Sequence, residues 1–462
     1  MVRCTSQPSD AGRGRRSGAG PTGARAPDRS RALTVTARAL TARTFSALGT
    51  RNYRYFFAGQ TISVTGSWLQ STAQAWLILQ LTHSPLVLGL LLTVQFLPNL
   101  LLQPLGGLVA DRWSKRQVLI FTQSCFGLTA TALGITDGLG QARPLEVFLL
   151  VALFGLINVV DGPTRQAFVP EMVGSRQMPN AVALNSLVFN GARVVGPALG
   201  GILIATVGTA FCFDLNAVSY LAVIAGLWMM HPSELHFSKR ATGVRPGVVA
   251  QLREGVGYVR RTPEVAMVIV LMAVVGTFSY NLTLMVTSLA RTGLHSGASG
   301  FGLLSAAIGV GALIGALGVA YAGRVSIPSL LVGCGVFGTF LALAGQTDGL
   351  VQAMVMLTMA GIGMIVYSAM SNSVIQTFTP ASLRGRVMSL YLWVFLGTSP
   401  IGSLLFGAIE QAWGSRVALA IGGAAAVLAA LGGTWWWHRL SRSRRDYPSG
   451  SASTGSIAAP TA

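Results

Sequence analysis

The sequence predicts an all-α integral membrane protein with twelve transmembrane helices arranged in two six-helix bundles. Hydrophobic residues make up 52% of the chain and charged residues only 10%, whereas soluble domains carry about 25% charged residues. Apolar stretches of roughly 20 residues recur along the chain, and each is long enough to cross a bilayer core of about 30 Å. One long internal connection, residues 231–263, separates six of these stretches from the other six.

The predicted spans of the first bundle lie within residues 51–230, and those of the second lie within 264–440. The flanking segments 1–50 and 441–462 are polar, rich in Gly, Ser and Arg, and lack hydrophobic periodicity, so we expect disordered tails. The connection 231–263 is expected to be a loop that includes a short surface helix. In order, the predicted spans are approximately 54–80, 86–110, 117–136, 145–164, 182–206, 211–230, 264–290, 300–323, 327–346, 350–375, 386–409 and 416–437.

The positions of the basic residues predict the orientation of the chain. Lys and Arg concentrate before the first span, around residues 112–116, within 239–261 and after the last span. Because basic residues in short loops stay on the inner side, both termini are expected on the cytoplasmic side of the membrane. The net charge of +19 therefore indicates topology and contact with the lipid bilayer, and it does not predict binding of nucleic acid.

A short repeat supports the division into two halves. The pattern Q-x-F-x-P occurs at residues 166–170, after the fourth span, and again at 376–380, after the tenth span. Each occurrence is followed by basic residues and by a span that contains a proline. Internal repeats of this kind are how many secondary transporters are built.

The stretch GGLVADRWSKRQ, residues 106–117, marks the abrupt end of the second span. Its pattern resembles the signature loop between helices two and three of the major facilitator superfamily, although Ser114 stands where many members have Gly. Span five carries a second likeness, because its glycines and proline are similar to a motif of proton-coupled exporters. The matching residues are Gly107, Asp111, Arg112, Lys115 and Arg116 in the loop, and Gly196, Pro197, Gly200 and Gly201 in span five.

Within this superfamily the chain resembles the bacterial branch that contains siderophore and macrolide exporters. Stretches such as RNYRYFFAGQTIS, DGPTRQAFVPEMV and RGRVMSLY carry the likeness, which extends over nearly all of residues 51–439. The resemblance implies export of a small organic molecule, either a siderophore-like compound or a hydrophobic drug as in multidrug resistance. It also implies protons as the coupling ion, alternating access in a monomer, and no cofactor.

The charges of the signature loop suggest a conformational switch. Asp111 can meet a positive helix N-terminus or an arginine of a neighbouring helix. Arg112 can pair with Asp161 near the inner end of span four, and Asp161 can also reach Arg165 at the i+4 position. Remaking such a cluster would favour inward-open or outward-open states. The alternative is that these bases only determine topology.

Polar side chains within the spans predict a central cavity. In span one they recur every three or four positions, which places them on one helical stripe that is unfavourable against lipid. The superfamily resemblance implies that spans one, four, seven and ten line the cavity. The alternative is hydrogen bonding between helices without contact to a substrate. The candidates are Gln60, Ser63, Ser67, Gln70 and Gln74 in span one, Asn158 in span four, Tyr280 and Asn281 in span seven, and Ser368 and Asn372 in span ten.

Arg193 lies in the middle of span five, on a predicted face with Ser186, Asn190 and Pro197. An arginine at this depth is unfavourable by several kcal/mol unless it is paired or hydrated, so it is a functional candidate. It could bind an anionic or oxygen-rich substrate, or pair with Asp161 or Asp214.

Other classes of protein fit the sequence less well. No phosphate-binding G-x-x-x-x-G-K-[ST] loop is present, which argues against an ATP-driven pump. The four cysteines and five histidines lack the spacing of metal ligands, so neither a metal site nor an enzyme is predicted. An importer, an uncoupled facilitator or a non-transporting sensor of the same fold remain alternatives.

Overall fold

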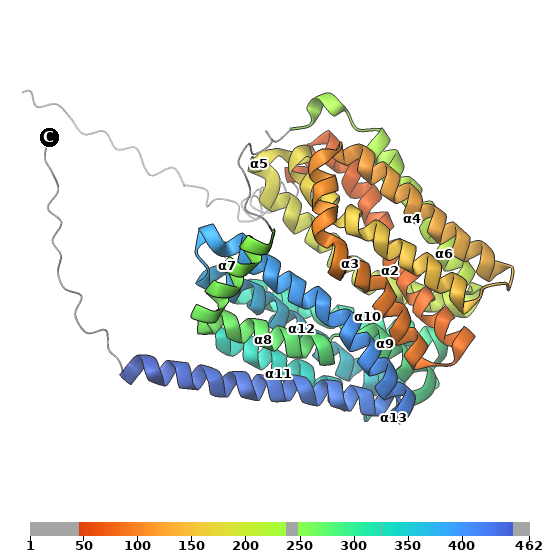
Figure 1. Cartoon of the computed structure of the whole chain (residues 1–462). Coiled ribbons are helices and arrows are strands. Elements are labelled where there is room, and N and C mark those ends of the chain that lie inside the picture. The colour runs from red at the N-terminus through yellow and green to blue at the C-terminus, as the bar shows by residue number, and fades with distance from the viewer. Residues whose placement is uncertain (1–45, 237–247, 324, 447–462) are drawn as a thin grey trace, which may run out of the picture. The chain divides into compact units, whose positions relative to one another are not determined.

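The structure is a computed structural model that describes residues 46–236, 248–323 and 325–446 (Figure 1). Within these ranges every regular element is a helix. The expected tails 1–45 and 447–462 lie outside the described residues, as does the side chain of Asp111. The elements are η1 (Ser46–Gly49), α2 (Arg51–Thr82), α3 (Pro85–Arg112), α4 (Lys115–Gly138), α5 (Pro144–Val207), α6 (Thr209–Trp228), η2 (Pro232–Glu234), α7 (Val248–Arg261), α8 (Pro263–Phe278), α9 (Leu282–Ser288), the π-helical η3 (Leu289–Gly293), α10 (Gly297–Ala322), α11 (Ile327–Ala344), α12 (Leu350–Phe378) and α13 (Ala381–Asp446).

Ten helical segments in the described residues are long and apolar enough to cross a membrane. They include the two halves of α5, Pro144–Gly174 and Arg176–Val207, and one segment of 60 residues in α13, Leu383–Arg442. Helix α2 is a further span, whose polar stripe lowers its hydropathy, and α13 divides into two spans at Gly414. The arrangement is therefore consistent with the predicted twelve spans.

Three glycines divide the long helical runs. Gly174 interrupts α5 with φ 70° and ψ 171°, and Gly414 interrupts α13 with φ 81° and ψ 168°. Gly208, between α5 and α6, has φ 94° and ψ 173°. Only glycine adopts this region of backbone space without severe strain. Gly208 follows the fifth span and Gly414 follows the eleventh, so the two halves use the same turn at equivalent places.

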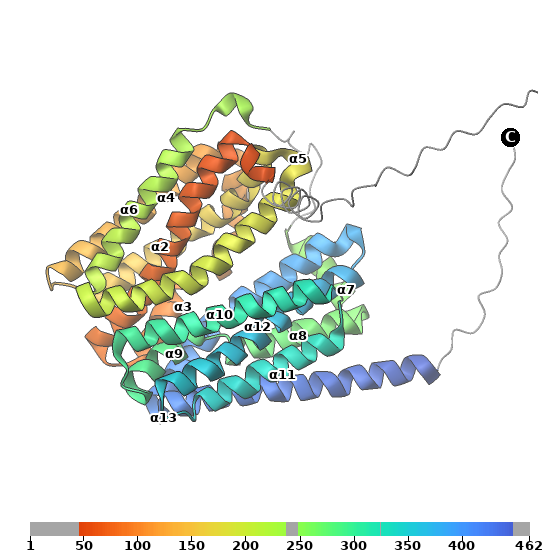
Figure 2. The same ribbon diagram turned by 180° about the vertical axis from the view of Figure 1, so that it is seen from behind.

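The six spans of each half pack together, and the two bundles lie side by side (Figures 1 and 2). The main contacts between the bundles join α5 to α10 and α3 to α13. We call the end of the molecule that carries residues 82–85, 207–209 and 293–297 the closed end. The end that carries residues 112–115, 174–176 and 378–381 is the open end, toward which the bundles diverge in both views.

Glycines bring the two bundles together near the closed end. A Cβ atom at Gly201 of α5 would lie 2.5 Å from the Gly302 Cα atom of α10, and one at Gly89 of α3 would lie 2.3 Å from the Ser403 carbonyl oxygen of α13. Toward the open end, a Cβ atom at Gly107 or Gly318 would meet nothing within 4 Å. These close approaches pack the bundle interface tightly near the closed end.

Residues 46–50, which the sequence assigned to a tail, belong to the described part of the chain. Ala47 is fully buried, and its backbone N–H donates to the Asn180 Oδ1 atom of α5 at 2.9 Å. The Thr50 hydroxyl donates to the Gln177 side chain at 2.9 Å. These contacts with α5 explain why residues 46–50 are ordered although they lack hydrophobic periodicity. At the other end, α13 continues to Asp446, beyond the predicted limit of 440.

Candidate central cavity

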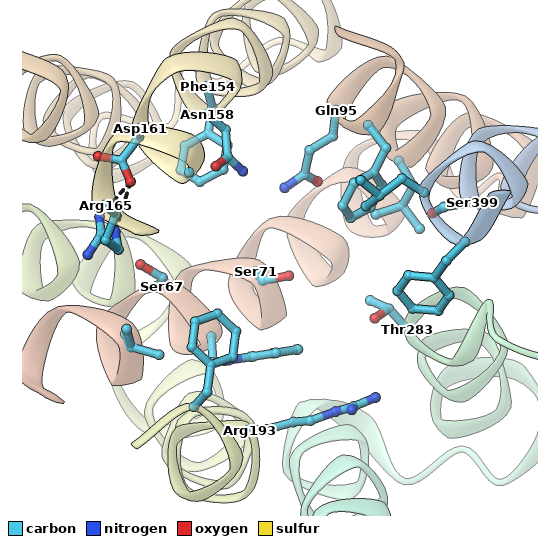
Figure 3. A pocket seen from close by; sticks show the side chains of 18 of the residues that line it. Ser67, Ser71, Gln95, Phe154, Asn158, Asp161, Arg165, Arg193, Thr283 and Ser399 are labelled. Carbon is cyan, nitrogen blue, oxygen red and sulfur yellow. Dashed lines mark hydrogen bonds and ion pairs between the residues drawn. The ribbon is translucent and has the colours of Figure 1, made fainter. Parts of the chain in front are cut away.

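A cavity of about 580 Å³ lies between the two bundles (Figure 3). Helices α2 to α6 of the first bundle and α8, α9 and α13 of the second contribute to its wall. Aromatic rings supply much of the apolar surface. The polar or charged residues of the lining are Gln60, Ser63, Ser67, Ser71, Gln95, Asn158, Asp161, Arg165, Gln166, Asn185, Arg193, Tyr220, Tyr280, Asn281, Thr283, Thr398, Ser399 and Ser403.

The polar stripe of α2 divides into two parts. Gln60, Ser63 and Ser67 line the cavity, as the spacing predicted. Gln70 instead accepts a hydrogen bond from the Asn216 amide of α6 at 2.6 Å, and the Gln74 amide donates to the Gln95 side chain at 3.4 Å. Neither Gln70 nor Gln74 is part of the cavity lining. The helix-packing alternative therefore holds for the part of the stripe nearer the closed end.

Asp161 of α5 is the centre of a buried polar cluster. Its Oδ1 atom accepts hydrogen bonds from the Thr122 hydroxyl at 2.7 Å and the Gln123 amide at 2.8 Å. Its Oδ2 atom pairs with the Arg165 guanidinium at 2.6 Å, in the i+4 arrangement predicted from the sequence (Figure 3). Arg165 also donates to the Gln60 side chain. Three donor side chains, one of them a guanidinium, therefore surround the Asp161 carboxyl group at the cavity wall.

The bases of the signature loop are held within the first bundle. The Lys115 ammonium pairs with Glu171 at 2.6 Å, joining α4 to α5. The Arg116 guanidinium donates to the carbonyl oxygens of Leu227 and Trp228, at the C-terminal end of α6, where a positive charge is favourable. Arg112 is exposed at the end of α3. None of these three bases lines the cavity.

Arg193 lines the cavity without an acidic partner among the described residues (Figure 3). Its Nη2 atom lies 3.8 Å from the Met364 Sδ atom, and its Cζ atom lies 5.7 Å from the centre of the Trp68 ring. The two acids considered from the sequence do not pair with it: Asp161 binds Arg165, and Asp214 is exposed beside α4.

The cavity-facing side of α5 differs from the predicted one. Asn185 and Phe189 line the cavity with Arg193, whereas Ser186 and Asn190 do not. The Ser186 hydroxyl donates to the Val182 carbonyl oxygen and the Asn190 amide to the Ser186 carbonyl oxygen, so their own helix satisfies both side chains. Ser186 and Asn190 therefore lie outside the cavity lining in this structure, whereas Asn158 belongs to it.

The seventh span is interrupted beside the cavity. Helix α8 ends at Phe278 and α9 begins at Leu282, which leaves Ser279, Tyr280 and Asn281 outside the helix. Tyr280 and Asn281 line the cavity as predicted. The Asn281 amide donates to the Thr277 carbonyl oxygen at 2.8 Å, and its Oδ1 atom accepts from the Ser403 hydroxyl of α13 at 3.0 Å.

The tenth span does not contribute the predicted polar residues. Ser368 and Asn372 of α12 are outside the cavity lining, and the Asn372 amide donates to the Ser368 carbonyl oxygen at 3.1 Å. Instead, α13 supplies Thr398, Ser399 and Ser403. Packing of α12 against α10 and α11 holds it behind the lining helices.

The glycines of the span-five motif are packing positions. A Cβ atom at Gly196 would lie 2.4 Å from the Trp68 Cβ atom of α2, and one at Gly200 would lie 3.2 Å from Thr72. Gly201 faces α10 across the bundle interface. Pro197 is buried and borders a smaller pocket next to Arg193. The motif thus sets how closely α5 approaches α2 and α10.

Sequence reasoning did not identify Ser71, Gln95, Asn185, Thr283 or the three polar residues of α13. Ser71 lies one turn after Ser67, so the helical stripe of α2 could have been followed through it. In α13, Ser399 and Ser403 are four residues apart, so the same spacing argument could have found them. Gln95, Asn185 and Thr283 have no such pattern to distinguish them from polar residues that bond to their own helix.

Comparison with known proteins supports this architecture. Residues 42–445 match the family described as transmembrane secretion effector. The chain is 26% identical to the enterobactin exporter EntS of Escherichia coli O157:H7 over 412 residues, which cover 87% of this chain and 96% of the relative. It is 28% identical over 172 residues to the staphyloferrin A transporter of Staphylococcus aureus, a match that spans 37% of this chain and 43% of that relative.

Solved structures share the fold at low sequence identity. The nucleoside transporter NupG aligns with a TM-score of 0.65 and 12% identity, covering 84% of this chain and 99% of the other. A bacterial homologue of the iron transporter ferroportin aligns with a TM-score of 0.64 and 16% identity, covering 84% and 98%. The chain is a multi-pass membrane transporter that belongs to the transmembrane secretion effector family of the major facilitator superfamily.

Proposed function

We propose that this protein exports a small organic molecule across the bacterial cytoplasmic membrane by alternating access. The leading substrate classes are a siderophore-like compound and a hydrophobic drug. The observation that carries the proposal is a cavity of about 580 Å³ between two bundles whose interface is tightly packed near the closed end. The names of the siderophore exporter relatives support the direction and the substrate class.

The orientation follows from the basic residues. Arg112, Lys115, Arg116 and Arg176 all lie at the open end of the first bundle. If this end faces the cytoplasm, as the positive-inside rule predicts, the cavity lies on the route from the cytoplasm and the closed end forms the outer barrier. An exporter would load its substrate in this state.

Movement between states would require the Gly201–Gly302 contact to separate. A larger side chain at Gly201 would favour separation, because no room exists for a Cβ atom in the closed arrangement. We expect Gly201→Leu to shift the population toward an outward-open state. The probe is a cysteine placed at Ser305 and labelled by a membrane-impermeant reagent added outside the cell. Labelling should be greater with Gly201→Leu than with Gly201 retained. Unchanged labelling in a well-inserted variant argues against alternation about this contact.

The proposed energy source is the proton gradient, used by proton antiport, and Glu410 is the candidate proton-carrying residue. Glu410 lies in α13 near the closed end and is 4% exposed; within the described part of the chain neither carboxyl oxygen accepts a hydrogen bond of ordinary geometry, although the Ser288 hydroxyl lies beside the group. An ionised carboxylate without a partner is strongly unfavourable in such surroundings, so the proposal assigns Glu410 a proton in this state. Opening of the closed end would bring the group into contact with outside water.

The primary test of export is small-molecule mass spectrometry on cells and medium of a deletion strain and its complemented parent under iron limitation. Retention of a siderophore in the deletion strain, with release restored by complementation, supports dedicated export. If the two strains release the same small molecules, siderophores are excluded as substrates, and drug accumulation in the cells is measured next. Loss of uptake in the deletion strain would instead indicate an importer.

A further inference from the structure

A small pocket adjoins the central cavity on the side toward the closed end. It has a volume of about 60 Å³ and shares Trp68, Ser71, Arg193 and Thr283 with the larger cavity, so the two spaces are contiguous. Ser305 of α10 belongs to the small pocket alone. A space of this size accommodates a few water molecules or one small polar group of a larger ligand.

Arg193 supplies an uncompensated positive charge to this pocket. Its two close contacts, the Met364 sulfur and the Trp68 ring, leave most of its five N–H donors without an oxygen acceptor from the described protein. By contrast, Arg165 in the same cavity is neutralised by Asp161. A buried guanidinium without a counter-charge favours an anionic ligand.

Hydroxyl groups surround the same space. The side chains of Ser71, Thr283 and Ser305 border the pocket, and within the described part of the chain none of them forms a hydrogen bond to protein. Their neighbour Thr72 differs, because its hydroxyl donates to the Trp68 carbonyl oxygen at 3.0 Å. Figure 3 shows Ser71, Thr283 and Arg193 on the same side of the cavity. The three free hydroxyls can therefore donate to a bound anion.

We propose that Arg193, Ser71, Thr283 and Ser305 form a subsite for a carboxylate group of the transported molecule. A planar carboxylate matches the planar, two-pronged guanidinium. Its apolar remainder would lie against Trp68, Phe189 and the other aromatic rings of the central cavity. The expected substrate class is therefore an amphiphilic carboxylate, and this assignment rests on the proposed transport function.

The subsite contains groups from both bundles. Ser71 and Arg193 belong to the first bundle, whereas Thr283 and Ser305 belong to the second. A carboxylate bound between them adds contacts that exist only while the bundles are together at this level. Such a ligand binds the closed-end conformation better than a separated one, and differential affinity of this kind is what shifts a conformational equilibrium.

The test compares 2-naphthoate with 2-naphthamide, which have similar size and differ in charge, by equilibrium dialysis against the purified full-length protein. We expect wild-type protein to bind the acid about tenfold more tightly than the amide, as for a charge-assisted hydrogen-bond pair. Arg193→Gln should bring the two affinities together, mainly by weakening the binding of the acid. Arg193→Lys should retain part of the preference, because it keeps the charge but loses the planar fork.

Arg416→Gln is the matched control, since it removes one positive charge from a residue that pairs with Asp348 away from the cavity. It should keep the wild-type preference. Equal binding of acid and amide by the wild type, or an unchanged preference in Arg193→Gln, would overturn the subsite. The two proposals can fail separately. If the purified protein prefers the acid but the deletion strain exports the same compounds as its parent, the subsite stands and the export proposal is contradicted.

Discussion

Two acidic residues of this transporter, Asp161 and Glu410, are equally buried and have opposite surroundings. Each is 4% exposed. Asp161, in the first bundle, accepts hydrogen bonds from Thr122, Gln123 and Arg165. Glu410, in the second bundle, has no hydrogen bond of ordinary geometry among the described residues and only the Ser288 hydroxyl beside it. The difference teaches that burial alone does not define the role of an acid. The donors around an acid decide how strongly its ionised form is stabilised.

The largest effect on stability is expected from Asp161→Ala. The substitution leaves Arg165, Thr122 and Gln123 without their shared acceptor, and breaking a buried pair costs about 3 kcal/mol. The Arg165 side chain is 19% exposed and lines the cavity, so water will recover part of this loss. Thermal unfolding in detergent, followed by the reactivity of the buried thiols of Cys212 and Cys334, measures it.

Asp214→Ala is the control for that measurement, because Asp214 is an exposed acid of the same bundle. It should lower the unfolding temperature little. A loss as large as that of Asp161→Ala would mean that the buried cluster has no special importance.

A double substitution sharpens the comparison further. Asp161→Ala combined with Arg165→Leu removes both charges, so no isolated guanidinium remains at the cavity wall. We expect the double variant to be more stable than Asp161→Ala by about 1–2 kcal/mol, the interaction energy typical of such neighbours. Strictly additive losses in the unfolding experiment would show that the two side chains act independently.

Glu410→Gln should change stability by less than about 1 kcal/mol, because it replaces one neutral, unpaired group by another of the same shape. Its effect should appear in coupling. In proteoliposomes, substrate flux of the wild type is expected to follow an imposed proton gradient, while the variant shows only exchange that is insensitive to the gradient. A variant that still follows the gradient would exclude Glu410 as the carrier.

The smallest effect is expected from Lys115→Gln. The Lys115 and Glu171 side chains are 20% and 9% exposed and pair at 2.6 Å, away from the cavity. Loss of a partly exposed pair of this kind lowers stability by about 1 kcal/mol or less. Binding of 2-naphthoate should be unchanged, and altered binding would show that the signature loop communicates with the cavity in this state.

Most of the fold follows from sequence, because alternation of apolar runs with polar turns is a direct consequence of the bilayer. The lining is harder to predict. Ser186 and Asn190 are polar residues of the same helix as Asn185. Their side chains, however, donate to carbonyl groups one turn earlier on α5. A polar residue that its own helix satisfies can face any surroundings, so polarity alone does not identify a cavity wall.

The interruption of the seventh span had no sequence signal either. Glycine and proline are the usual causes of a helix break, and neither occurs at residues 279–281. The break persists because neighbours stabilise it: the Ser279 hydroxyl donates to the Gly422 carbonyl oxygen at 2.7 Å, and Asn281 bonds to Ser403. These are tertiary contacts between distant parts of the chain, which local spacing does not reveal.

That interruption has a mechanical consequence. Bending an intact helix stretches several backbone hydrogen bonds at once, whereas the two pieces α8 and α9 already lack a continuous ladder between Phe278 and Leu282. A change of angle between α8 and α9 therefore requires little free energy. It would occur beside Tyr280, at the cavity wall. Because Asn281 is bonded to Ser403, such a change would be transmitted to α13. The seventh span can thus act as a hinge whose pivot lies at the wall of the central cavity.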